Sequence, residues 1–159
     1  MRIAIAAIGR MKQGPERELV ARYLERAAVT GRPLALTGFE VAESAESRAQ
    51  TVPERRAEEA RALRAALPDG VVVALDEHGK SLSSQAFAAR LAGWRDDGRP
   101  AASFLIGGPD GLDPDLLRRA DLMLSFSPLT WPHQLVRIML AEQLYRTTTI
   151  LAGHPYHRE

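Results

Sequence analysis

Three glycines stand within five positions in the run Gly107-Gly108-Pro109-Asp110-Gly111, directly after an apolar stretch. Glycine tolerates positive φ angles and carries no side chain, so a ligand can approach the backbone of such a turn closely. A phosphate loop would continue with Lys and Ser or Thr, and a dinucleotide site would need Gly-x-Gly-x-x-Gly after the first strand. The sequence has neither. The turn favours a nucleoside ligand held by backbone groups and apolar walls, although an ordinary strand-to-helix turn would look the same.

A second unusual segment covers residues 125–133, Ser-Phe-Ser-Pro-Leu-Thr-Trp-Pro-His. Its two prolines restrict the backbone, which lowers the entropy cost of holding a binding loop in one shape. His133, the last residue of the segment, could exchange a proton near neutral pH, although a lone histidine is often structural. The alternative is a rigid surface connection in which Trp131 is simply buried.

The chain ends in a short polar tail, Gly153-His-Pro-Tyr-His-Arg-Glu. A polar terminus usually frays. Against that interpretation, Tyr156 and His157 can stack on a base and Arg158 can pair with phosphate, a combination suited to unstacked RNA nucleotides. His154 and His157 stand three residues apart, but Pro155 lies between them and no third ligand is nearby, so we expect no metal site.

The composition is that of a water-soluble, folded protein. The chain has 159 residues, 45% of them hydrophobic and 26% charged, which predicts one domain over residues 1–159. The absence of cysteine excludes a disulfide framework, a thiolate nucleophile and cysteine-ligated zinc. No apolar run approaches the roughly 20 residues that span a bilayer, and the apolar start resembles a strand more than a signal peptide. We therefore expect a cytoplasmic protein.

The formal net charge of +1 excludes a strongly basic protein that wraps nucleic acid. It leaves room for a local basic cluster that contacts RNA phosphates. Four basic residues near the start of the first predicted helix are candidates for such contacts, with an ordinary solvated helix face as the alternative: Arg10, Lys12, Arg17 and Arg22.

Short apolar runs alternate with amphipathic segments along the whole chain. We predict strands at residues 2–8, 34–41, 71–75, 102–106 and 122–124, a loop at 42–51, and a turn at 76–80. Helices are expected to begin near Pro15, Pro53, Ser83 or Ser84, and Asp113, with a final helix from about 134 to 147 or beyond. This alternation predicts an α/β fold, a parallel sheet with helices on both faces.

Ligands of open α/β sheets bind beyond the carboxyl ends of the strands. The predicted strand ends at Leu75, Ile106 and Leu124 bring the glycine-rich turn and the 125–133 segment to that edge. The final helix is apolar on more than one face, which is typical of a helix that is centrally buried or shared with a partner subunit. Arg137 and Glu142 within it need partners. We expect a homodimer.

These segments, in this order, resemble the ribosomal RNA large-subunit methyltransferase H family, the pseudouridine N3-methyltransferases of the SPOUT (α/β-knot) superfamily. The likeness runs from end to end of the chain. Residues 42–51 show nothing typical of the family, and Trp131 is bulkier than the Leu or Phe expected there. The matching segments are residues 8–12, 75–80, 104–112, 125–133, 135–145 and 156–158.

The resemblance implies a fold and a cofactor. The C-terminal part would form a trefoil knot, which ordinary connection rules would exclude. S-adenosylmethionine would lie in the knot, without a metal, and the enzyme would be a homodimer in which the tail of one subunit completes the site of the other. The residues that would contact the cofactor are Leu75, Gly107, Phe126, Ser127, Pro128, Leu129, Thr130 and Trp131.

The resemblance also implies a reaction: methylation of N3 of a pseudouridine in helix 69 of 23S rRNA, within the assembled ribosome. That nitrogen lies between two carbonyls and must lose its proton to become nucleophilic, so the enzyme aligns and deprotonates. The catalytic candidates are His133, Tyr156, His157 and Arg158. Either histidine could accept the proton, and Arg158 could stabilise the anion or hold phosphate.

Two other functions remain open at the level of sequence. The first keeps the cofactor but changes the acceptor to another RNA base or a ribose. The second is a ribosome-associated binding protein that uses the same pocket without catalysis. The presence of the glycine turn, the 125–133 segment and the tail together argues against the second.

Overall fold

Five parallel strands in the order β2-β1-β4-β3-β5 form the sheet of the computed structural model, which describes residues 1–158. The chain runs through β1 (Arg2–Ile8), α1 (Pro15–Gly31), a 3₁₀ helix η1 (Arg32–Leu34), β2 (Thr37–Ser44), α2 (Val52–Ala65), β3 (Val71–Ser81), α3 (Ser84–Asp96), β4 (Ala101–Ile106), α4 (Pro114–Arg119), β5 (Leu122–Ser125) and α5 (His133–Leu151). The predicted parallel α/β sheet is confirmed, with all five strands near their expected places.

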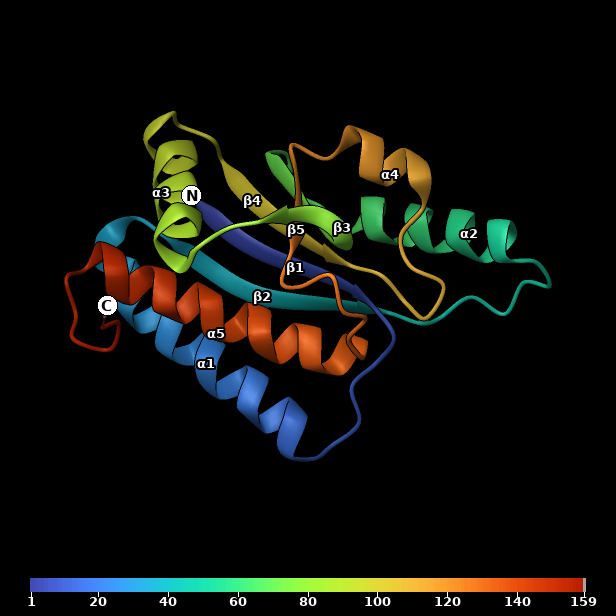
Figure 1. Cartoon of the computed structure of the whole chain (residues 1–159), viewed down its shortest axis with the longest axis horizontal. Helices are drawn as coiled ribbons and strands as arrows, with labels where there is room; N and C mark the ends of the chain where they lie inside the picture. Colours follow the sequence, from blue (N-terminus) through green and yellow to red (C-terminus); the bar gives the residue numbers. More distant parts are fainter. Residues whose placement is uncertain (159) are drawn as a thin grey trace.

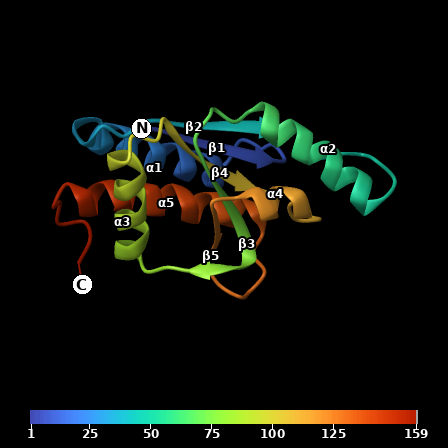
Figure 2. The same ribbon diagram turned by 90° about the horizontal axis from the view of Figure 1, so that it is seen from above.

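Helices cover both faces of the sheet (Figures 1 and 2). Alternate residues of β1 enter two separate apolar clusters. Ile3 and Ile5 pack with residues of α1, α3 and α5, whereas Ala6 and Ile8 pack with residues of α2 and α4. Burial on both faces explains why the central strands β1 and β4 are apolar apart from Arg2 and Ser103.

Local capping fixes where several helices begin. Thr51 and Glu54 form a reciprocal capping box at the start of α2, and the side chains of Ser83 and Asp113 accept backbone N–H bonds at α3 and α4. Of the two serines proposed as the cap of α3, Ser83 is therefore the correct one. Among residues 1–158, no helix is both long and apolar enough to span a membrane.

The second strand departs from its predicted bounds. Leu34, the first residue of the predicted strand, ends η1, and β2 begins at Thr37 and continues to Ser44. The predicted loop at 42–51 therefore shrinks to residues 45–51. Gly38 and Phe39 both have positive φ, at the point where the pairing with β1 shifts register. Pairing with β1, which a single-strand pattern does not reveal, extends β2 beyond its apolar stretch.

The predicted turn at residues 76–80 is a bulge inside β3. Leu75 and Lys80 both pair with Leu124 of β5, so the residues between them leave the ladder and rejoin it. A Cβ on Gly79 would lie 2.7 Å from the Met123 carbonyl carbon and 2.8 Å from the Leu124 backbone. The bulge thus presses directly on β5, and only glycine fits at this contact.

Candidate functional site

A cavity of about 900 Å³ opens at the bulge of β3 and the ends of β4 and β5. Its size suits a nucleoside-based ligand, and its position is the one expected for an open α/β sheet. Its walls come from residues 75–78, 106–112, 123–124, 126–127, 129–133 and 136, with Arg56, Pro114 and Leu117 at one end. The two segments that stood out in the sequence therefore meet around one cavity.

The glycine-rich turn forms a backbone wall of this cavity. A Cβ on Gly107 would lie 2.9 Å from the carbonyl carbon of Gly111 and 3.0 Å from the Leu112 nitrogen. Gly111 has φ of +80°, and its N–H donates to the Gly108 carbonyl at 3.0 Å. Side chains at these positions would break the turn, so a ligand meets peptide groups here.

The 126–131 loop forms another wall of the cavity and is held by the hydroxyl groups of Ser125 and Thr130. Ser125 Oγ lies 2.9 Å from the Ser127 carbonyl and 3.1 Å from the Glu77 carbonyl. Thr130 Oγ1 donates to the Glu77 carboxylate at 2.8 Å. The loop is thereby fixed to the β3 bulge. Trp131 is 40% exposed, so the alternative of a simply buried tryptophan is wrong.

The residues expected to contact a cofactor lie together around the cavity, with one exception. Pro128 is part of the same loop but does not line the cavity. The lining members of the set are Leu75, Gly107, Phe126, Ser127, Leu129, Thr130 and Trp131.

His133 begins α5 and lies at the cavity, beside the connection between β1 and α1. Its Nε2 would be 3.5 Å from a Cβ on Gly9. One helical turn further on, Arg137 is only 2% exposed and donates to the Ile8 and Gly9 carbonyls at 2.7 and 2.5 Å. Its Nη1 contacts Glu43 at 2.6 Å.

Burial lowers the pKa of Arg137, and the Glu43 carboxylate counteracts this effect. Glu43 also accepts the Met11 N–H at 3.0 Å. The buried arginine therefore fixes the β1–α1 connection beside His133. The need of Arg137 for a partner was predictable from its place in an apolar helix; the identity of the partner, 94 residues away, was not.

The tail lies at the opposite end of α5 from His133 (Figure 1). The Tyr156 hydroxyl donates to Glu142 at 3.0 Å, and its ring centroid is 4.7 Å from that of Tyr145. Arg146 lies over the Tyr156 ring, 4.9 Å from its centroid, and 3.4 Å from His157 Nδ1. Burial and the bond with Glu142 raise the pKa of the Tyr156 hydroxyl.

The four catalytic candidates thus fall into two groups within one chain. The tail folds back onto Glu142 and Arg146, which follow His133 by 9 and 13 residues, so the groups are separated by roughly 14–20 Å along α5 at about 1.5 Å per residue. His133 lines the cavity, whereas Tyr156 and His157 pack against residues 142–146 of α5 and Arg158 is exposed. Glu142 was expected to need a partner, but its contact with Tyr156 was not predicted, and Arg146 was missed. The spacing of four between Glu142 and Arg146 along a helix was the available signal.

Comparison with known proteins gives a consistent result. A family model described as "Predicted SPOUT methyltransferase" matches residues 1–157. Proteins named ribosomal RNA large subunit methyltransferase H, from Rhodopseudomonas palustris (strain BisA53) and Brucella anthropi, are 59% and 56% identical over 159 residues and are matched over 99% of both chains. A probable methylase family protein from Haemophilus influenzae Rd KW20 has a similar fold, with a TM-score of 0.51 at 13% identity over 95% of this chain and 66% of that one.

Proposed function

Because this chain belongs to the SPOUT methyltransferase family, and within it to the ribosomal RNA large-subunit methyltransferases H, we propose that it methylates large-subunit rRNA with S-adenosylmethionine. The acceptor is N3 of a pseudouridine in helix 69 of 23S rRNA, in the assembled ribosome of the cytoplasm. Residues 1–159 act as one methyltransferase domain. The observation that carries the proposal is identity of 59% along the whole chain to a protein of that name.

The cavity suits the cofactor. S-adenosylmethionine joins a nucleoside to an amino acid, and it needs an apolar slot with peptide groups nearby. Gly107 supplies backbone without a side chain, while Leu75 and Phe126 supply apolar surface. The residues that would hold the cofactor are those of the glycine turn, Leu75 and the 126–131 loop. When bound, it supplies a methyl group on a sulfonium, which is already activated for transfer to a nucleophile.

The protein's own task is then to align the base and remove the N3 proton. Of the two histidines, His133 lines the cavity of its own chain, so we assign it the role of proton acceptor. Tyr156 keeps its proton, because burial and Glu142 raise its pKa, and it is therefore suited to stack on or donate to the base. His157 and Arg158 bind the rRNA beside Tyr156, and Arg158 contacts either an RNA phosphate or the anion that develops on the base.

A homodimer would bring the two groups together. Since the tail packs against residues 142–146 of α5, away from the cavity that His133 lines, the tail of one subunit completes the cavity of the other in this proposal. Leu129, Trp131 and Leu135 are large apolar side chains that are 67%, 40% and 40% exposed around the start of α5. Exposed apolar groups of this kind are typical of a surface that a partner covers. The trefoil knot belongs to the same proposal.

Exposed basic side chains near the β1–α1 connection would meet the rRNA backbone. Arg10 and Lys12 lie in that connection, and Arg17 donates to the Met11 carbonyl at 3.2 Å, which holds the helix start against it. Together with Arg22 they give a local positive surface beside the cavity that holds His133, despite a net charge of only +1.

Two measurements, made one after the other, test the proposal. Calorimetry with S-adenosylmethionine comes first, and the absence of binding at millimolar cofactor would refute any methyltransferase function. Incubation with ribosomes that lack the modification, followed by mass mapping of the rRNA, then identifies the acceptor. We expect one added methyl on a helix 69 pseudouridine. A methyl on another nucleotide, or on a ribose, would reject the specific assignment.

A further inference from the structure

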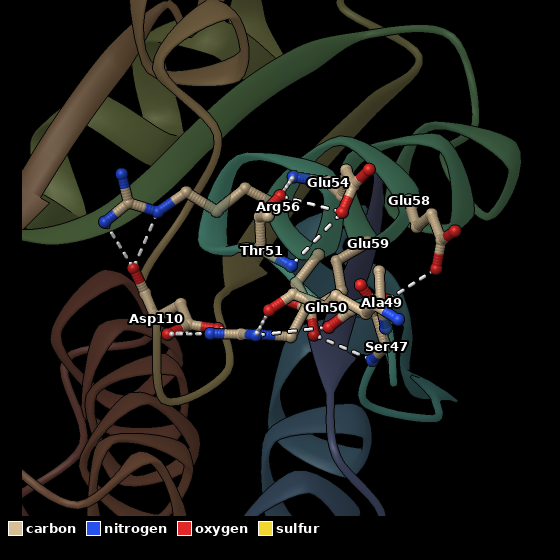
Figure 3. Close-up of polar contacts among 10 residues, drawn as sticks. Ser47, Ala49, Gln50, Thr51, Glu54, Arg56, Glu58, Glu59 and Asp110 are labelled. Carbon is tan, nitrogen blue, oxygen red and sulfur yellow. Dashed lines mark hydrogen bonds and ion pairs between the residues drawn. The ribbon is translucent and has the colours of Figure 1, made fainter.

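Asp110, in the glycine-rich turn, has all three of its oxygen atoms held by two adjacent arginines of α2 (Figure 3). Arg55 makes a two-pronged contact with the carboxylate, Nε to Oδ2 at 2.6 Å and Nη2 to Oδ1 at 3.2 Å. Arg56 directs Nε and Nη2 at the Asp110 carbonyl oxygen, at 2.8 and 2.5 Å. One residue of the cavity wall is thus bound through both its side chain and its backbone.

The turn itself has little to hold its shape. Among the described backbone contacts, the Gly111 N–H to Gly108 carbonyl bond is the one that closes it. Three glycines in five residues lose much conformational freedom on ordering, so the turn's conformation is costly to maintain without outside contacts. Because residues 106–112 form a wall of the cavity, that conformation decides whether a ligand fits.

The arginine side of the contact is well anchored. Arg55 Nη1 donates to the Ala49 carbonyl at 3.1 Å and to the Gln50 carbonyl at 3.3 Å, so its guanidinium bridges the 45–51 loop and the turn. Both arginines follow directly on the capping box of Thr51 and Glu54, which fixes the start of α2. A capped helix start therefore carries the guanidinium groups that bind the glycine-rich turn.

Global stability does not explain this arrangement. The side chains of Arg55 and Asp110 are 26% and 24% exposed, and ion pairs in contact with solvent contribute little to the free energy of unfolding. A two-pronged arginine–carboxylate contact adds geometric specificity instead. The effect is thus local, on the orientation of the turn.

We propose that Arg55 and Asp110 are positioning residues that hold the glycine-rich turn in the conformation that receives S-adenosylmethionine, with Arg56 holding the same residue through its carbonyl. The inference rests on the proposed function, because it takes that cofactor as the ligand of the cavity. Under this proposal, α2 and the 45–51 loop before it contribute to cofactor binding, although Arg56 is the only residue of these two segments that lines the cavity.

The test is a double-mutant cycle on cofactor affinity, measured by calorimetry without RNA. Asp110→Asn removes the charge and keeps the shape, and we expect it to raise the Kd of S-adenosylmethionine about tenfold. Arg55→Lys keeps the charge but loses the fork, and we expect a smaller rise of about fivefold. Since the two residues act through one contact, the double variant should bind no more weakly than Asp110→Asn alone.

Arg95 and Asp96 of α3 provide a matched control. The Arg95 side chain is 22% exposed, contacts Asp96 through Nε alone at 2.8 Å and donates to the Leu34 carbonyl at 3.2 Å. It therefore combines an ion pair with a backbone contact as Arg55 does, away from the cavity and without the two-pronged geometry. Arg95→Lys and Asp96→Asn should leave the Kd unchanged. Without cofactor, the Tm should fall by similar small amounts in the Arg55 and Asp110 variants and in the Arg95 and Asp96 variants.

The outcomes distinguish a failure of the proposed function from a failure of the positioning role of Arg55 and Asp110. If the unmodified protein does not bind the cofactor, the proposed function fails and this inference with it. If it binds, and the Arg55 and Asp110 variants bind equally well or lose affinity additively, the positioning role is wrong while the proposed function stands. Equal weakening in the Arg95 and Asp96 variants would also overturn the role, because it would trace the loss to general loosening of the fold.

Discussion

Among residues 1–158, Arg137 is the most buried charged residue, and polar groups surround its guanidinium and offset the cost of burying the charge. Its guanidinium is 2% exposed and is bound by Glu43 and by two carbonyls at the end of β1. Removing one partner of a buried ion pair is far more destabilising than the pair's net contribution, because the remaining groups stay buried and unsatisfied.

We therefore expect Arg137→Met to lower the free energy of unfolding by about 3 kcal/mol, and Arg137→Lys by clearly less, because lysine keeps the charge beside Glu43. Urea denaturation measures both. Arg95→Met is the control: Arg95 is 22% exposed at its side chain, and its loss should cost about 1 kcal/mol or less. Equal losses for Arg137→Met and Arg95→Met would contradict the buried network described for Arg137.

His133 is the residue on which the proposed proton transfer depends. Replacing it by glutamine keeps a polar side chain of similar size but removes the proton acceptor, so methylation of ribosomes should fall by about 10² or more. Cofactor affinity should stay within about threefold, since the walls of the cavity remain. Single-turnover methylation and calorimetry check the two parts; a near-normal rate would transfer the role to His157.

At the scale of elements, the contact between the β3 bulge and β5 shapes the cavity. Residues 76–79 leave the ladder, and the cavity and the 126–131 loop both use the surface they create. Gly79 makes this contact possible, because its Cα lies against the β5 backbone. Backbone cannot move aside as a flexible side chain can.

Gly79→Ala should accordingly destabilise the protein by about 2–4 kcal/mol and weaken cofactor binding, since the bulge must shift. Gly93→Ala is the matched substitution in the last turn of α3, where no atom lies within 4 Å of the added Cβ. There alanine should stabilise the protein by up to about 1 kcal/mol through helix propensity. The Tm of Gly79→Ala should fall and that of Gly93→Ala should rise. A change of the same sign in both would disprove the role of the β5 contact.

The elements show which features a sequence alone reveals. The strand at residues 2–8 and the starts of α1 and α3 were predictable, because an apolar run, a first-turn proline and a serine cap act locally. The β3 bulge was not, since it exists only through pairing with β5, 49 residues from Leu75 to Leu124 along the chain. The part of Arg55 in the site could not be predicted from the sequence either, because its partner Asp110 is 55 residues away.

The whole molecule responds to acid through its paired carboxylates. Hydrogen bonds from Arg55 and from Arg95 lower the pKa of Asp110 and of Asp96 in the folded state. A group whose pKa is lowered by folding stabilises the protein above its ordinary value, about 3.9 for aspartate, and loses that contribution as the pH falls through the lower folded value.

The contribution of Asp96 and Asp110 to the free energy of unfolding should therefore be constant from pH 8 to about 5 and decline below about pH 4. In the double variant Asp96→Asn with Asp110→Asn, the acid decline should be shallower, and the difference from the unmodified protein should shrink at the lowest pH. Urea midpoints along a pH series measure this. Parallel curves at every pH would show that the two pairs do not contribute.

The proposed dimer makes the final prediction at the scale of the assembly. If each site joins the cavity of one subunit to the tail of the other, two inactive variants can repair each other. His133→Ala has an intact tail and a defective cavity; a chain ending at Gly153 has an intact cavity and no tail. Each alone should bind the cofactor within a few-fold of normal, apart from any direct effect of His133, and each should fail to methylate ribosomes.

Mixed at equal amounts and allowed to exchange subunits, about half of the dimers are mixed, and each mixed dimer has one complete site of two. Methylation should therefore recover to about a quarter of the normal rate, once exchange has reached equilibrium. Mixing His133→Ala with a chain that carries both defects is the control and should recover nothing, because no cavity in that mixture is intact. The absence of recovery in the first mixture, with mixed dimers verified by native mass spectrometry, would mean that the tail serves its own chain.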